Sequence, residues 1–138
     1  MKNQQLHFCF HGEEIAYQVV LPAVRLYLQL LNLGNAGLIE VAIAEAVSNA
    51  MRASGDQFVN IHMYVTASHS LLVRIRDHGK GFDVEKAKAR MVEWDKEIPA
   101  ESLYAESGRG LWVIYQVFDK VQFNHPGNEL LLVKSLSR

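Results

Sequence analysis

Two polar side chains in this sequence, Glu45 and Asn49, lie four residues apart in the stretch Glu45-Ala46-Val47-Ser48-Asn49-Ala50. Residues at this spacing project from one flank of a helix. The small Ala42 beside them leaves room for a ligand. Taken alone, the pair is better interpreted as two polar residues at the border of a buried helix face.

A second stretch, Asp77-His78-Gly79-Lys80-Gly81, follows an alternating apolar segment that predicts a strand. An ionised carboxylate only accepts hydrogen bonds, so it suits an exocyclic amine such as that of adenine. The two glycines allow positive φ angles and the close approach of a flat ligand. An ordinary turn after a strand is an equally good interpretation, because Asp and Gly are both preferred there.

A third stretch, Gly108-Arg109-Gly110, comes directly before an apolar segment that predicts a helix over 111–118. A glycine turn at a helix N-terminus presents unpaired N–H groups and the positive end of the helix dipole, which suits phosphate. Arg109 can add a charge-assisted contact. A loop with unusual dihedral angles and a solvated Arg109 is the alternative.

Period-two alternation near the N-terminus predicts a β-hairpin. Leu6, Phe8 and Phe10 alternate with polar residues, and 15–21 alternates again after a Gly-containing turn. One helix over 13–32 is the competing interpretation. Because proline within a helix removes a hydrogen bond and clashes with the preceding turn, Pro22 favours a strand followed by a helix over about 22–32.

The next helix, expected over about 36–53 with Asn35 as its N-cap, carries the first polar stretch. Its predicted buried stripe consists of Ile39, Ile43, Ala46, Val47 and Ala50. Strands over 58–66 and 71–76 then form a hairpin that brings Asp77 to the edge of a sheet. Segment 83–106 has no strand character, and a functional lid and a plain surface excursion are equally compatible with it.

The helix over 111–118 and a closing hairpin over 121–136 complete the expected elements. Their order predicts one α+β domain over 1–138, a two-layer sandwich with helices covering one face of a mostly antiparallel mixed sheet. The net charge of −1 gives no reason to expect nucleic-acid binding, and no apolar run approaches the length of a membrane span. The single cysteine, Cys9, lies in an apolar alternation and is expected to be a buried free thiol of a reducing, cytoplasmic compartment.

In their order along the chain, the three stretches resemble the N box, G1 box and G2 box of the GHKL (Bergerat-fold) ATPase superfamily. The N box matches 45–50, the G1 box matches 77–83, and the G2 box matches Ser107-Gly108-Arg109-Gly110-Leu111. The short chain is most similar to the anti-sigma-factor serine kinases of bacterial partner-switching systems. The resemblance extends from the first predicted hairpin to 130–134.

This resemblance implies a role for each matched position. Glu45 would be the general base for the incoming serine hydroxyl, and Asn49 would ligate Mg²⁺ that bridges the phosphates of ATP. Asp77 would bind the adenine amine above a floor formed by Gly79 and Gly81. The phosphates would be held by the G2 box, Ser107, Gly108, Arg109, Gly110 and Leu111, and about 83–107 would be the ATP lid.

The resemblance also implies partners. The substrate would be a serine on a STAS-domain anti-anti-sigma protein, a sigma factor or similar target would be sequestered, and the kinase would be a homodimer. Many relatives have a histidine at the position of Ala53 and some have a basic residue at that of Glu106. A nucleotide-dependent partner-binding module with little kinase activity is therefore the alternative. A sensor histidine kinase domain ranks lower, because no phospho-accepting His-Glu helix pair precedes the N box.

Overall fold

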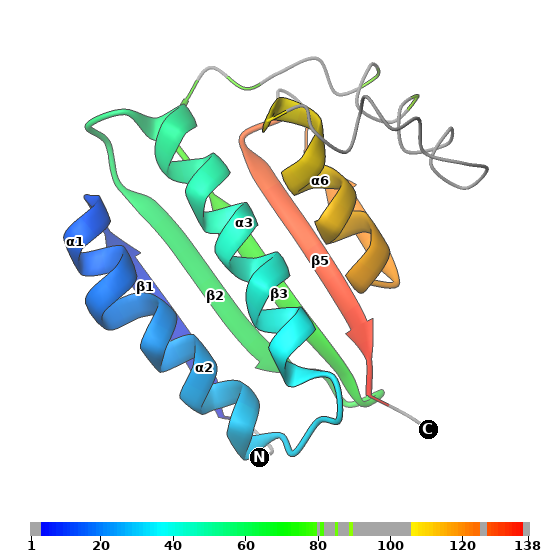
Figure 1. Cartoon of the computed structure of the whole chain (residues 1–138). Helices are drawn as coiled ribbons and strands as arrows, with labels where there is room; N and C mark the ends of the chain where they lie inside the picture. Colours follow the sequence, from blue (N-terminus) through cyan, green and yellow to red (C-terminus); the bar gives the residue numbers. More distant parts are fainter. Residues whose placement is uncertain are drawn as a thin grey trace.

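A five-stranded antiparallel sheet in the order β1-β2-β3-β5-β4 forms one layer of the molecule (Figure 1). The computed structural model describes residues 4–79, 81, 85, 89, 106–124 and 127–136, with only the backbone described for 106–110. The strands are β1 Gln5–Phe10, β2 Val59–Val65, β3 Ser70–Arg76, β4 Lys120–Phe123 and β5 Glu129–Ser135. Both the hairpin over 58–76 and the closing hairpin are confirmed.

The register of the strands places the apolar residues on the face of the sheet that the helices cover. Ile61 pairs with both Phe8 and Ile75, and Val73 pairs with Leu132. Alternate residues of each strand point to opposite faces, so the neighbours of these residues lie on the other face. Cys9 is one of them, and it is exposed. The expectation of a buried thiol was wrong because the alternation in β1 turns the partly buried Phe8 and the buried Phe10 towards the core instead.

All helices whose structure is described lie on one face of the sheet (Figure 1). They are a continuous helical segment made of α1 Glu13–Ile15, η1 Ala16–Val20 and α2 Leu21–Leu30, then α3 Ala36–Ser54 and α6 Glu106–Val117. This arrangement confirms the predicted α+β sandwich. The α3 helix lies between the first helical segment and α6, and it packs against α6.

The predicted strand over 15–21 is wrong, and the competing single helix over this part of the chain is correct. Pro22 lies at the first turn of α2, after a π-helical turn in which the Leu21 N–H donates to the Ala16 carbonyl. A π-helical turn widens the helix locally and changes the hydrogen-bond ladder. The proline ring and its missing N–H are therefore accommodated without a break in the helical path.

The α3 helix is the central element of the core. Its predicted buried stripe is confirmed, since the five residues named from the periodicity are all buried. Asn35 occupies the N-cap position, but its side chain makes no capping hydrogen bond, and Gly55 ends the helix with a positive φ angle. The largest buried side chains around α3 are Leu28, Ile61, Met63, Leu71, Ile114 and Leu132.

The predicted lid over about 83–107 lies outside the described residues, apart from residues 85 and 89 and the backbone of 106 and 107. Within the part of the chain that is described, no helix has both the length and the apolar character needed to cross a membrane.

Candidate nucleotide site

The predicted pair Glu45 and Asn49 lies on α3 at the border between its buried stripe and solvent, and both side chains are half-buried. The Arg52 guanidinium, one turn further along the helix, donates a hydrogen bond to Oδ1 of Asn49. This oxygen is the atom that the resemblance assigns to the metal. The structure thus places a cation beside it, which sequence spacing alone did not reveal.

Asp77 directly follows β3, as predicted, and is buried with 9% of its surface exposed. Its N–H donates to the Asn128 carbonyl at 2.9 Å, which ties the start of the turn to the chain segment before β5. Its Oδ1 accepts a hydrogen bond from the Gly79 N–H at 2.7 Å. The carboxylate is therefore held in one orientation by its own turn.

Burial raises the pKa of the Asp77 carboxyl, while the hydrogen bond from Gly79 and the nearby His78 act in the opposite direction. A buried carboxylate with a raised pKa is a costly group to retain in a folded protein. Carboxyls whose pKa is raised by burial occur preferentially at functional sites.

Gly79 lies against the C-terminal end of α3, and the absence of a side chain is what permits this contact. A Cβ atom built on Gly79 would lie 2.4 Å from the carbonyl oxygen of Ala53 and 2.9 Å from Oδ1 of Asp77. Gly81 has a φ angle of 85°, a conformation that favours glycine. Both glycines of the G1 stretch therefore have a backbone reason to be glycine.

The G2 stretch begins differently from the prediction. The α6 helix starts at Glu106, so residues 107–110 form its first turn and do not precede it. Glycine accepts helical as well as left-handed dihedral angles, which is why a glycine-rich turn can continue a helix. In a helix that starts at Glu106, the N–H groups of 107 and 108 have no partner within the helix, so these two still suit phosphate.

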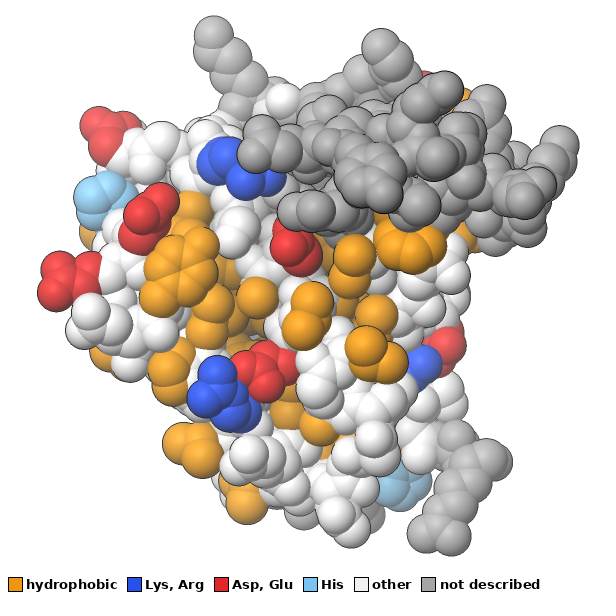
Figure 2. All heavy atoms as spheres, in the orientation of Figure 1, with side chains coloured by type: hydrophobic (Ala, Val, Ile, Leu, Met, Phe, Trp, Pro, Cys, Tyr) orange, Lys and Arg blue, Asp and Glu red, His pale blue; other side chains and the backbone are white. Residues whose placement is uncertain are grey.

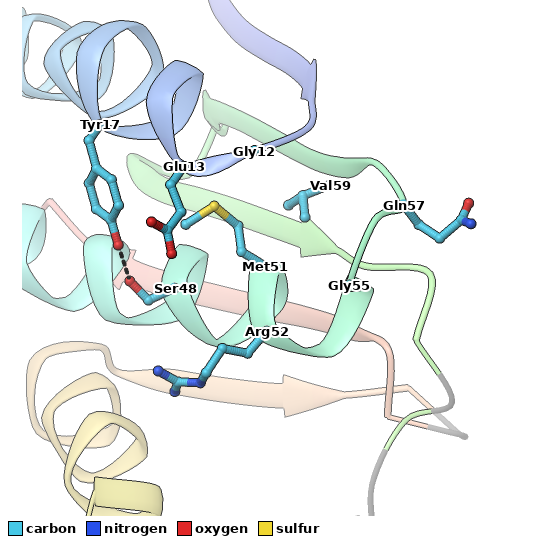
Figure 3. Close-up of a pocket in the computed structure, with 9 residues that line it drawn as sticks. All are labelled: Gly12, Glu13, Tyr17, Ser48, Met51, Arg52, Gly55, Gln57 and Val59. Atoms are coloured by element: carbon cyan, nitrogen blue, oxygen red, sulfur yellow. Dashed lines mark hydrogen bonds between the residues drawn. The ribbon is translucent and has the colours of Figure 1, made fainter.

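The helical layer also contains a hollow of about 270 Å³, between the first helical segment and the C-terminal half of α3 (Figure 3). Its lining includes Glu13, Tyr17, Ser48 and Met51, and the Tyr17 and Ser48 hydroxyls are 3.1 Å apart. Arg52, whose guanidinium contacts Asn49, also lines it, whereas Glu45, Asn49 and Asp77 do not. In the described parts of the chain, no group of three or more His, Cys, Asp or Glu side chains is placed to hold a metal ion.

Comparison with known proteins identifies the family of this chain. Residues 16–134 match the sequence model of the family described as the histidine kinase-like ATPase domain. The chain belongs to this family. It is 31% identical over 101 residues to the serine-protein kinase RsbW of Oceanobacillus iheyensis, covering 69% of this chain and 61% of that protein.

A second relative, the serine-protein kinase RsbW of Bacillus cereus, is 26% identical over 137 residues, and the alignment covers 88% of this chain and 85% of the relative. Both relatives are named as serine-protein kinases, and the alignment with the first spans 61% of that protein's length. The GHKL resemblance read from the three stretches is thereby confirmed at the level of the family.

Proposed function

We propose that this protein is an ATP- and Mg²⁺-dependent protein-serine kinase of a partner-switching system. The observation that carries the proposal is that all three predicted stretches meet at the α3 helix. Glu45 and Asn49 lie on α3, the Asp77 turn is in contact with the C-terminal end of α3, and α6 packs along its side. The first turn of α6 comes from the G2 stretch.

Each end of a nucleotide has a partner in this arrangement. Asp77 would accept a hydrogen bond from the adenine amine, with Gly79 and Gly81 below the ring. The N–H groups of 107 and 108, with the rest of the G2 stretch, Arg109, Gly110 and Leu111, would surround the phosphates. Mg²⁺ prefers oxygen ligands and retains several waters, so Asn49 Oδ1 and phosphate oxygens suit it. The bound metal would neutralise phosphate charge, and Arg52 would turn from Asn49 towards the phosphates.

Glu45 is the proposed general base. Its half-buried carboxylate lies one turn before Asn49 on the same flank of α3. An acceptor hydroxyl placed between Glu45 and the metal-bound phosphate would lose its proton to Glu45 as the phosphoryl group is transferred. Positioning and charge neutralisation make up most of the catalysis in phosphoryl transfer. In this proposal Asn49, Asp77 and Arg109 provide the positioning and the charge neutralisation.

The acceptor protein must cover the part of α3 that surrounds Glu45. Hydrophobic side chains are exposed on this helix face (Figure 2), among them Leu38 at 63% and Val41 at 52% of their surface. Val41 lies one turn before Glu45 and Leu38 one turn before that. We assign this stripe to the acceptor, a serine-bearing STAS-domain protein, with a sigma factor as the second partner. The proposal includes a homodimer in the cytoplasm, where the exposed Cys9 stays reduced.

The proposal is tested by incubating the protein with ATP labelled at the γ-phosphate and with STAS-domain proteins of the same genome. Label should transfer to one serine and require Mg²⁺. Glu45→Ala should lower the transfer rate about 100- to 10,000-fold, the usual contribution of a general base, and leave ATP affinity within about twofold. Glu14→Ala, which removes an exposed carboxylate of the first helix, is the matched control and should transfer at the wild-type rate.

If the wild type binds Mg-ATP but transfers label to none of these proteins, the kinase assignment fails. The nucleotide-dependent binding module then becomes the better account. The contact of Arg52 with the metal-binding oxygen of Asn49 would fit that outcome, because it competes with the metal.

A further inference from the structure

The side chain of Ser54 joins the end of α3 to the Asp77 turn, although its position next to Gly55 marks it only as part of a helix stop. It is buried, with 5% of its surface exposed, and is the last residue of α3. Its hydroxyl accepts a hydrogen bond from the His78 N–H at 3.1 Å. The same hydroxyl donates to the Phe58 carbonyl at 3.3 Å.

These two contacts fix the hydroxyl completely. A serine hydroxyl has a single proton to donate, and here it goes to the Phe58 carbonyl, so an oxygen lone pair faces His78. His78 directly follows Asp77. The backbone between Asp77 and Gly79 is therefore attached to α3 by the buried side chain of Ser54. Removing that side chain would leave the His78 N–H without this acceptor.

Backbone contacts hold the turn on both sides of the Ser54 link. Gly79 lies against the Ala53 carbonyl, and the Asp77 N–H is held by the Asn128 carbonyl. Asn128 itself is fixed by Asn124, whose Oδ1 accepts hydrogen bonds from the N–H groups of 127, 128 and 129. Among the described side chains that hold the turn, Ser54 is the one that belongs to the helix carrying Glu45 and Asn49.

We propose that Ser54 is a positioning residue that sets the selectivity of the site for adenine, by holding Asp77 at a fixed place relative to α3. This inference rests on the proposed function, since it assumes that Asp77 receives the adenine amine. Ser54 itself makes no contact with the nucleotide. It orients the carboxylate that does, and links the adenine end of the site to the metal end.

The test compares ATP with inosine triphosphate, which has an oxygen in place of the exocyclic amine. Affinities of both nucleotides are measured by calorimetry with Mg²⁺ for the wild type, Ser54→Ala, Ser54→Thr and Ser48→Ala. The Ser54→Ala variant should lose about tenfold in its preference for ATP over inosine triphosphate, equivalent to about 1.4 kcal/mol. Ser54→Thr keeps the hydroxyl and should restore the preference.

Ser48→Ala is the matched control, because its hydroxyl is bonded to Tyr17 on the other side of α3 and should not affect the ratio. A merely structural role would change thermal stability, or both affinities equally, without changing the ratio. If the wild type prefers ATP and Ser54→Ala prefers it as strongly, Ser54 has no positioning role. If the wild type itself shows no preference, the adenine assignment of Asp77 fails, and this inference fails with it.

Discussion

Replacing Gly79 by alanine should weaken ATP binding, because the structure has no space for the added methyl group. The new Cβ would lie 2.4 Å from the Ala53 carbonyl oxygen, a backbone atom that cannot rotate away. The conflict is relieved by moving the Asp77 turn away from α3. Overpacking of this kind costs about 1–3 kcal/mol. Since the displaced turn carries the adenine-binding carboxylate, we expect Mg-ATP affinity to fall about 5- to 150-fold.

Isothermal titration calorimetry with Mg-ATP measures this directly. The matched control is Gly37→Ala, the same chemical change in the first turn of α3, where a Cβ would meet nothing within 4 Å beyond the backbone of its own helix. Alanine is the better helix former by about 1 kcal/mol, so this variant should be at least as stable as the wild type and bind ATP with unchanged affinity. Wild-type affinity in Gly79→Ala would refute the close packing of the turn on α3 as a requirement for binding.

Three further outcomes are expected. Asp77→Asn should unfold at a higher temperature than the wild type at neutral pH. Because its pKa is raised in the folded state, protonated Asp77 stabilises the fold. This stabilisation is complete below the ordinary pKa of an Asp and is lost as pH rises through the folded-state pKa. The higher melting temperature of Asp77→Asn should disappear at low pH. Its ATP binding should be weaker than that of the wild type. If Asp77→Asn melts below the wild type at neutral pH, burial of the Asp77 carboxylate has no cost. Val41→Glu should impair phosphorylation of the acceptor protein about tenfold or more with unchanged ATP affinity, because it places a charge in the proposed docking stripe. Ala67→Glu, in an exposed turn, is its control in the same transfer assay, and equal rates for the two would exclude the stripe. Ile43→Ala should lower the free energy of unfolding by about 2–5 kcal/mol in denaturant titrations, since Ile43 is fully buried, and a loss below about 1 kcal/mol would place it outside the core.

Several parts of this fold were predictable because one local pattern determined them. The 3.6-residue period of α3 correctly predicted its buried stripe, and period-two alternation found β2 and β3. The first helical segment was mispredicted for a physical reason. Alternation of 15–21 fits a strand, yet Ala16 and Val20 also lie on one helix face, and the π-helical turn that accommodates Pro22 has no signature in the residues themselves.

The site was predictable to a similar extent. The positions of Asp77 and the two α3 residues followed from strand and helix signals, whereas the start of α6 at Glu106 did not, because glycines are compatible with both a loop and a helix. The Ser54 link was not predictable. It joins residues 24 apart in the sequence through a contact that depends on how α3 ends against the turn after β3.

The measurement that tests the central claim most directly is a titration of the ¹⁵N-labelled protein with Mg-ATP, followed by amide NMR. If the three stretches form one nucleotide site, the amide signals of Gly79, Gly81, Gly108 and Gly110 should shift together with one dissociation constant. Gly12, which lines the hollow of Figure 3 beside the first helical segment, is the internal reference and should not follow them. Saturable shifts at Gly12 with unmoved signals at Gly79 and Gly108 would contradict the account.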